Sequence, residues 1–206
     1  MPPRASRPTS TSRGDRTRVA ILDAAVPLFA RYGYRGAPLA AVATAADMTP
    51  PGLLHHFPSK VHLLMAVLEA RDQEAKRRVK GVLRDGGHAT LTALQDLVAY
   101  NATTRELVQM FTVLVGEGVS ADHPAHQYFV DRYERLRHGQ TRALHHGQES
   151  GELRADLDMS LVASLILAVM DGLQIQWLLE EDVEMPPRFA MFIEMLMGYL
   201  TADQKG

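Results

Sequence analysis

The 206-residue sequence contains no cysteine. Disulfide bonds, thiolate zinc sites, cysteine-ligated iron–sulfur clusters and cysteine nucleophiles all require that side chain, so each of them is excluded. The absence agrees with a reducing cytoplasm as the location of the protein.

Long hydrophobic runs are also missing. The longest, Leu161–Met170, is interrupted by Ser164 and is far shorter than the ~20 apolar residues that a transmembrane helix needs. The N-terminus is basic and rich in serine, threonine and proline, but no apolar segment follows it, so it lacks the pattern of a secretory signal. We therefore expect a cytoplasmic protein without a membrane-spanning segment.

Motifs of common enzyme classes are absent as well. The sequence contains no G-x-S-x-G nucleophile elbow, no P-loop and no glycine-rich dinucleotide motif. Several histidines lie close in sequence, but none has a carboxylate at convincing metal-ligand spacing (His123, His126, His138, His145 and His146). Four acidic residues in a polar region between helices are interpreted as solvated caps (Glu149, Glu152, Asp156 and Asp158). We expect neither a metal nor a cofactor.

The net charge of −2 hides an uneven distribution along the chain. Residues 1–60 contain eight lysines and arginines against three aspartates, a local charge of +5, and the remaining residues carry −7. A basic end joined to an acidic body indicates that the small end contacts a polyanion. The alternative is an arginine-rich segment that only confers solubility.

Helical periodicity begins after a short N-terminal segment. Residues 1–14 have no periodic apolar pattern and are expected to form a disordered basic arm. From Arg16 onward, apolar residues recur at intervals of three and four up to Gly33, where the predicted helix ends. Pro27 lies inside this helix and is expected to kink it, because proline lacks an amide hydrogen and clashes with the preceding turn.

Two short helices follow, joined by a tight turn. The first is predicted over Pro38–Ala46, and Asp47 tolerates the left-handed backbone that the turn requires. Thr49 is a good N-cap for a second helix over Pro50–Phe57, in which prolines occupy the first turn. Such a pair is typical of a helix-turn-helix.

The rest of the chain is predicted to be helical. Ser59 caps a long helix that runs to about Leu83, and Gly86-Gly87 interrupts the chain. About five further helices follow, separated by breaks near Glu106 and at residues 116–124, 147–158 and 181–187. No alternating pattern is long enough for a strand, so the fold class is all-α with about nine helices.

Residues 38–64, PLAAVATAADMTPPGLLHHFPSKVHLL, resemble the DNA-binding region of the TetR family of transcriptional regulators. The matching pieces are Phe29-Ala30-Arg31-Tyr32-Gly33-Tyr34, Val42-Ala43, Ala46, Met48-Thr49, Leu53, His56-Phe57, Ser59-Lys60 and Leu63-Leu64. The resemblance is specific over about residues 16–68. A second string is similar to the segment that leads into the family's dimerisation helix (Gly151-Glu152-Leu153-Arg154, Asp158, Asp171-Gly172-Leu173 and Trp177).

The resemblance implies a helix-turn-helix DNA-binding domain at residues 15–60 and a helical ligand-binding and dimerisation domain at 61–206. It implies a bacterial, ligand-responsive repressor, which is not an enzyme and which a small hydrophobic or aromatic effector releases from a palindromic operator. Three positions depart from the family pattern, which has Gly, Gly and Tyr where this chain has Asp47, Pro51 and Leu54. The leucine removes a phenol that commonly contacts a phosphate.

The DNA contacts are expected from the first turn of the recognition helix and from nearby polar residues. This turn offers few side chains for base readout, so DNA shape is expected to contribute to specificity. Arm arginines such as Arg13 are expected to add phosphate contacts. The candidate DNA-binding residues are Arg16, Thr44, Thr49, Pro50, Pro51, Gly52, His55, His56 and Lys60.

The larger half contains apolar residues for a ligand pocket and for a subunit contact. A mainly apolar set, without an evident buried cation, is expected to line the pocket: Tyr100, Thr103, Thr104, Leu107, Met110, Phe111, Leu114, Tyr128, Phe129, Tyr133, Val169 and Trp177. For each of these residues, packing in the core is an alternative role. A helix near 158–179 is apolar on two faces, which predicts a homodimer through a four-helix contact. The candidate interface residues are Leu161, Leu165, Leu173, Phe189, Phe192, Ile193, Leu196 and Leu200.

Two other functions remain open from the sequence. One is an all-α enzyme or ligand-binding dimer in which the N-terminal helices are structural. The other is a non-specific architectural DNA-binding dimer or a purely protein-interaction dimer. Operator selectivity and the salt dependence of binding separate a non-specific DNA-binding protein from a specific regulator.

Overall fold

The computed structural model describes residues 13–79, 86–180 and 182–201, and these form nine α-helices without a β-strand. The helices are α1 (Arg13–Gly36), α2 (Leu39–Ala45), α3 (Pro50–His56), α4 (Lys60–Val79), α5 (Gly87–Ala102), α6 (Arg105–Gly118), α7 (His126–Glu149), α8 (Met159–Leu179) and α9 (Met185–Thr201). The all-α class and the helix count predicted from the sequence are confirmed within this part of the chain.

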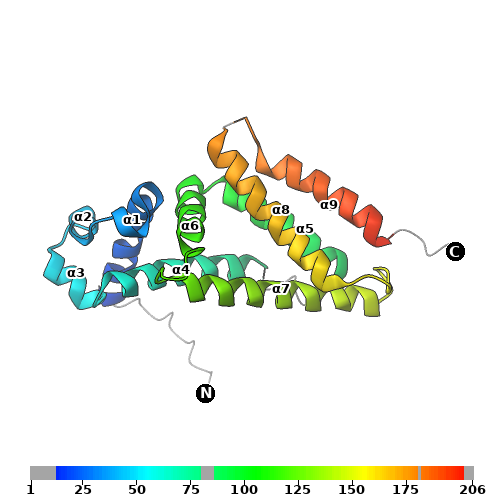
Figure 1. Ribbon diagram of the computed structural model, residues 1–206, viewed down its shortest axis with the longest axis horizontal. Coiled ribbons are helices and arrows are strands. Elements are labelled where there is room, and N and C mark those ends of the chain that lie inside the picture. Colours follow the sequence, from blue (N-terminus) through cyan, green and yellow to red (C-terminus); the bar gives the residue numbers. More distant parts are fainter. Residues whose placement is uncertain (1–12, 80–85, 181, 202–206) are drawn as a thin grey trace, which may run out of the picture.

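The small helices α1–α3 gather at one end of the elongated molecule, and α5, α8 and α9 lie toward the other (Figure 1). The long helices α4 and α7 run along one side between the two ends, and α6 stands between α1 and the larger half. The helix against which α1 packs most extensively is α6.

The first helix begins earlier than predicted and resumes after Gly33, the residue where we predicted that it ends. It begins at Arg13, so two residues that we assigned to the arm are helical, and residues 1–12 lie outside the described ranges. The non-helical residue inside α1 is Gly33 (φ 65°, ψ −175°), whereas the helix continues through the expected kink site Pro27. Pro27 and Asp23 are both exposed, so the carbonyl group that loses its partner lies on the water-facing side.

Two hydrophobic cores hold the structure together. One combines α1–α4 with residues of α6 and α7, so it crosses the domain boundary that we predicted after residue 60. The other combines α5, α7, α8 and α9. The predicted end of the fourth helix near Leu83 lies outside the described residues.

Helix α8 corrects one sequence-based expectation. Its 21 residues are, by length and composition alone, apolar enough to cross a membrane, so our exclusion of any such segment was too strong. One side of α8 packs in the second core through residues such as Ile166, whereas Leu161 and Leu165 on the opposite side are exposed. The apolar residues of α8 therefore form two faces, one buried in the core and one exposed.

The crossing of α5 and α7 depends on a close backbone approach at Gly147. A Cβ atom at this position would lie 2.7 Å from the Cα atom of Gly87 and 2.8 Å from a methyl carbon of Leu153. The backbone atom cannot rotate away, so any larger residue must push the two helices apart.

We predict that Gly147→Ala lowers the free energy of unfolding by about 1–3 kcal/mol, the usual cost of overpacking. Gly139→Ala on the same helix is the control, because its Cβ would meet nothing within 4 Å. The control is expected to raise stability by roughly 0.5–1 kcal/mol, since alanine favours a helix interior over glycine. Urea unfolding at one fixed protein concentration measures both. Equal stability of the two variants would contradict the close approach.

Candidate functional site

The turn between α2 and α3 has the features predicted from the sequence. Asp47 adopts a left-handed backbone with φ 54°. The Thr49 hydroxyl accepts a hydrogen bond of 3.3 Å from the Gly52 amide at the start of α3. The cap and the two following prolines fix where this seven-residue helix begins.

Most of the candidate DNA-binding residues lie on an accessible surface. Gly52, His56 and Lys60 are partly buried, and the other six are exposed (Arg16, Thr44, Thr49, Pro50, Pro51 and His55). His55 projects from the last turn of α3, and its ring contacts that of His56 edge to face. The buried anchor beneath this surface is Leu53, which packs in the first core.

Two cations tie the recognition helix and its neighbour to α1. The Arg18 guanidinium donates a hydrogen bond of 2.6 Å to the His56 carbonyl oxygen and lies over the Phe57 ring. The Lys60 ammonium donates to the Arg35 carbonyl oxygen at 3.3 Å, and burial lowers its pKa. Sequence reasoning missed Arg18, since nothing local shows a contact across 38 residues. It predicted that Lys60 contacts DNA but did not predict the hydrogen bond to the Arg35 carbonyl oxygen.

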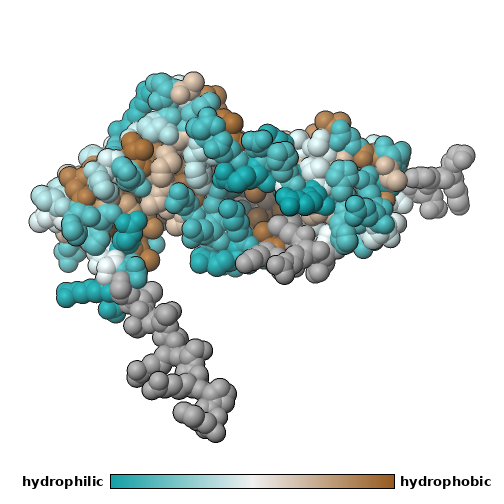
Figure 2. Space-filling view, turned by 90° about the horizontal axis from the view of Figure 1, so that it is seen from below, coloured by the Kyte–Doolittle hydropathy of each residue, from teal (hydrophilic) through white to brown (hydrophobic). Residues whose placement is uncertain are grey.

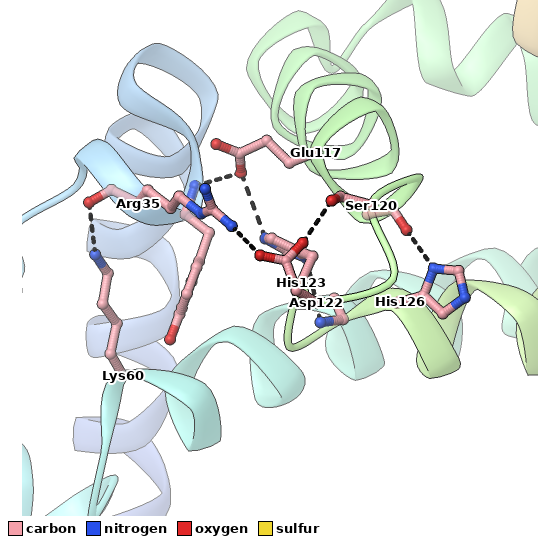
Figure 3. Close-up of polar contacts among 10 residues, drawn as sticks. Arg35, Lys60, Glu117, Ser120, Asp122, His123 and His126 are labelled. Atoms are coloured by element: carbon pink, nitrogen blue, oxygen red, sulfur yellow. Dashed lines mark hydrogen bonds and ion pairs between the residues drawn. The ribbon is translucent and has the colours of Figure 1, made fainter.

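A polar junction joins α1 to α6 (Figure 3). The Tyr34 amide donates a hydrogen bond of 2.7 Å to Glu117 Oε2, immediately after the backbone break at Gly33. On the exposed side, the Arg35 guanidinium lies 2.8 Å from the Asp122 carboxylate. The DNA-binding helices are thus attached to the larger half through the C-terminal end of α6, a contact that the sequence did not reveal.

His123 extends this junction in its buried part. The Ala125 amide donates to His123 Nδ1 at 3.2 Å, so the proton of the neutral ring lies on Nε2, which is 3.7 Å from Glu117 Oε2. Burial lowers the pKa of His123, although Glu117 opposes the effect. Within the described residues, no three histidine or acidic side chains are grouped closely enough to hold a metal ion.

A cavity of about 200 Å³ lies between α4, α5, α7 and α8. Its wall combines charged and amide side chains with the aliphatic residues Leu94, Leu97, Leu136, Leu167 and Met170. The face in Figure 2 is mostly hydrophilic, with hydrophobic atoms in patches between the polar side chains. The cavity lining thus combines an aliphatic wall with charged side chains.

None of the twelve expected pocket residues is among those that line this cavity. Met110, Phe111, Leu114 and Phe129 belong to the core shared with α1, and Leu107 and Tyr128 pack against that core. Val169 and Trp177 pack against the second core. The hydroxyl groups of Thr103 and Thr104 donate to backbone carbonyl oxygens at the end of α5. The Tyr133 hydroxyl donates to Asp171, and the Tyr100 ring lies under the Arg78 guanidinium.

The cavity also contains buried charges that we did not expect. Arg132 Nε donates to Asp72 Oδ1 at 2.7 Å, and the Tyr128 hydroxyl donates to Asp72 Oδ2 at 2.7 Å. Burial alone would raise the pKa of Asp72, but Arg132, Tyr128 and Arg71 outweigh it and lower that pKa. The Tyr133 hydroxyl donates to Asp171, whose pKa is raised by burial.

The outer face of α8 and α9 is apolar and uncovered. On α8 the exposed apolar residues form two pairs at a spacing of four, Leu161 with Leu165 and Ile175 with Leu179, and α9 adds Met191, Met195 and Tyr199 at the same spacing. Of the predicted interface residues, Phe189, Ile193 and Leu200 are buried in their own chain, and Leu173, Phe192 and Leu196 pack against the same core. Leu161 and Leu165 are the members of the predicted set that lie on the open face.

Comparison with known proteins gives two family matches and several relatives. Residues 21–67 match the model for bacterial regulatory proteins of the tetR family, and residues 88–201 match the C-terminal model of BetI-type transcriptional repressors. The A-factor receptor protein of Streptomyces griseus is 27% identical over 168 residues, which is 80% of this chain and 56% of the receptor. The HTH-type transcriptional regulator UidR of Escherichia coli is 23% identical over 188 residues, covering 91% of this chain and 94% of UidR.

Solved structures share the fold. GusR of Salmonella enterica superposes with a TM-score of 0.77 at 22% identity, covering 94% of this chain and 99% of GusR. The complex of SmeT with triclosan gives a TM-score of 0.77 at 19% identity, covering 89% of this chain and 90% of SmeT. At these identities the likeness establishes the architecture.

The family matches extend over both parts of the structure, the helix-turn-helix and the larger helical half. Proteins of this kind are dimeric regulators that bind DNA and respond to ligands, and they are not enzymes. The chain belongs to the TetR family of transcriptional regulators.

Proposed function

We propose that this protein is a cytoplasmic, homodimeric repressor that binds a palindromic operator and leaves it when a small effector enters the cavity. The observation that carries this proposal is the first hydrophobic core. It joins the exposed recognition helix α3, through α1, to α6, whose Phe111 lies against two arginines of the cavity. A change in the cavity therefore has a continuous packed route to the DNA-binding helices.

The DNA-contacting surface in this proposal is the set predicted from the sequence, centred on Thr44, Thr49 and His55. Their exposure and the cap that orients α3 support this role. Arg16 is an exposed cation without an ion pair among the described residues, which suits a phosphate contact, whereas Lys60 also holds the end of α1. Non-specific DNA binding and a pure interaction dimer are the outcomes that a binding experiment must exclude.

The effector in this proposal has an apolar body. The aliphatic wall of the cavity supports it, and so does the SmeT–triclosan complex, in which a protein of the same fold holds a small organic molecule. The ligand shifts the operator equilibrium only by its different affinity for the DNA-bound and free conformations. Helix α4 lines the cavity at one end and contacts α1 at the other, so α4 and α6 together carry the shift.

A second copy of this chain is proposed to cover the open face of α8 and α9. The family's dimeric state and the spacing of the exposed leucines on α8 support this contact. A two-fold pair also places two recognition helices about 34–36 Å apart, which matches successive major grooves.

We predict that selection from randomised duplex DNA at near-physiological salt enriches a palindrome with half-sites about 10–10.5 base pairs apart. His55→Ala is expected to weaken binding to that sequence by ~1–2 kcal/mol, with little change in non-specific binding. His138→Ala on α7 is the control, since that exposed histidine lies far along the chain from α3. Retention of DNA without enrichment, with steep salt dependence, would rule out a specific reader.

Substitution of Leu165, which is 61% exposed, is expected to abolish the dimer. Leu165→Arg places an unpaired charge at the centre of the proposed interface, a change that leaves the monomer's own core intact. Val130→Arg on α7, where valine is 45% exposed, is the matched control and is expected to stay dimeric. Light scattering after size-exclusion chromatography distinguishes the states. If the Leu165→Arg variant remains dimeric, the subunit interface lies on another face of the protein.

Gly33→Ala is expected to loosen the junction between α1 and α6. The new Cβ would require a left-handed backbone, which costs alanine roughly 1–2 kcal/mol, and it would collide with the Glu117 carboxylate. Hydrogen exchange of the Tyr34 amide, which donates to Glu117, reports the change directly. Gly116→Ala on α6 is the control, because its Cβ would meet nothing within 4 Å. Equal protection of Tyr34 in all three proteins would show that the junction is not tight.

A further inference from the structure

One buried arginine in the cavity lacks the hydrogen bonds that its charge requires. Arg71 is 8% exposed and lines the cavity from α4. Its nearest carboxylate oxygen, Asp72 Oδ1, is 3.7 Å away, and its guanidinium lies over the Phe111 ring at 3.6 Å from the ring centroid. Within the described ranges, the Arg71 side chain donates no hydrogen bond. Five N–H donors on a buried cation thus remain available.

The neighbouring carboxylates accept hydrogen bonds from side chains other than Arg71. Both oxygens of Asp72 are already engaged, one by Arg132 and the other by Tyr128. Asp171 accepts from Tyr133, and burial shifts it toward its neutral form. Burial and the charge of Arg132 lower the pKa of Arg71 to about 10, which still leaves the guanidinium charged at neutral pH. The two carboxylates nearest Arg71, Asp72 and Asp171, therefore already accept hydrogen bonds from other side chains.

The rest of the cavity fits a ligand with a charged end and an apolar body. The buried Gln140 Oε1 has no hydrogen-bond partner among the described residues, so the cavity also offers an acceptor for a ligand donor. Lys76 and Arg135 add exposed positive charge to the lining, and leucines from α5, α7 and α8 form the apolar part. An engineered apolar cavity of about 150 Å³ holds one benzene molecule. The somewhat larger volume here suits a single ring or a short chain with one polar group.

We propose that the effector is a small amphipathic carboxylate whose anionic group pairs with Arg71 and whose apolar body contacts the leucines of the cavity. This inference rests on the proposed effector function and specifies the ligand's chemistry. A guanidinium matches a carboxylate in bidentate geometry, and such a pair is stronger in a buried site than at the surface. Because Arg71 lies against Phe111, a ligand that draws the guanidinium also acts on α6.

The test uses two matched pairs of probes with the full-length protein. Phenylacetate is compared with phenylacetamide, and hexanoate with hexanamide, by isothermal titration calorimetry and by the shift in thermal melting. Each pair keeps the apolar body and removes the negative charge. We expect at least one carboxylate to bind at least ten-fold more tightly than its amide. Equal binding within both pairs, or no binding of either carboxylate at millimolar concentration, overturns the proposal.

Variants of the two buried arginines separate ligand recognition from structure. Arg71→Met keeps the unbranched aliphatic part of the side chain and removes the guanidinium, and it is expected to abolish the preference for carboxylates. Without ligand, this variant is expected to melt at or above the wild-type temperature, since it removes a charge with no full partner. Arg132→Met is the matched comparison, and it is expected to melt well below wild type because it strips Asp72 of its partner. A ligand-free Arg71→Met protein that melts several degrees below wild type contradicts the proposal.

The ligand measurement tests the chemistry of the effector, and the DNA measurement separately tests the repressor function. If the protein selects an operator but binds carboxylates and amides alike, the chemistry of the effector is refuted and the regulator stands. If the carboxylate preference depends on Arg71 but no DNA sequence is enriched, the anion site stands and the proposed repressor function is refuted. Arg71→Lys supplies a last check, because a lysine retains the charge without the bidentate geometry and is expected to restore part of the preference.

Discussion

The structure depends on a hydrophobic core that helices α1–α3 share with helices of the larger half. Residues 15–60 form a unit in the size range where a single core is marginal. Their core is completed by Met110, Phe111 and Leu114 of α6 and by Phe129 of α7. Helices α1–α3 therefore share their interior with helices of the larger half, and the packing is continuous across the boundary that we predicted after residue 60.

Phe111 contacts both apolar residues and positively charged side chains. One side of its environment is the apolar core with α1, and over its ring lie the guanidinium groups of Arg71 and Arg132. A cation over an aromatic face gains electrostatic attraction without giving up its hydrogen-bond donors. The ring thus stabilises a charge in the cavity while it belongs to the core that supports the recognition helix, which makes it the meeting point of the two halves.

The sequence predicted the features whose signals are local. The threonine cap, the left-handed aspartate, the prolines of α3 and the helix breaks depend on a few neighbouring residues, and they were found where expected. The cavity was missed because its contacts join distant positions, such as Arg132 with Asp72 across 60 residues. Phe111 and Leu114 were expected in the pocket because periodicity identifies a buried face without identifying what that face meets. The break at Gly33 lies where the sequence predicted the end of the first helix, whereas the kink expected at Pro27 is absent because the carbonyl that loses its partner lies on the exposed side.

The incompletely paired Arg71 has a consequence for the lifetime of the protein in the cell. A buried charge without a full partner lowers the stability of the empty protein, and any bound molecule that neutralises it stabilises the folded state. At a ligand concentration one hundred times the dissociation constant, this linkage contributes about 2.7 kcal/mol. Proteases act on the unfolded fraction, so the empty chain is degraded faster than the occupied one. The proposed effector would then preserve the pool of protein that can bind DNA once the effector is gone.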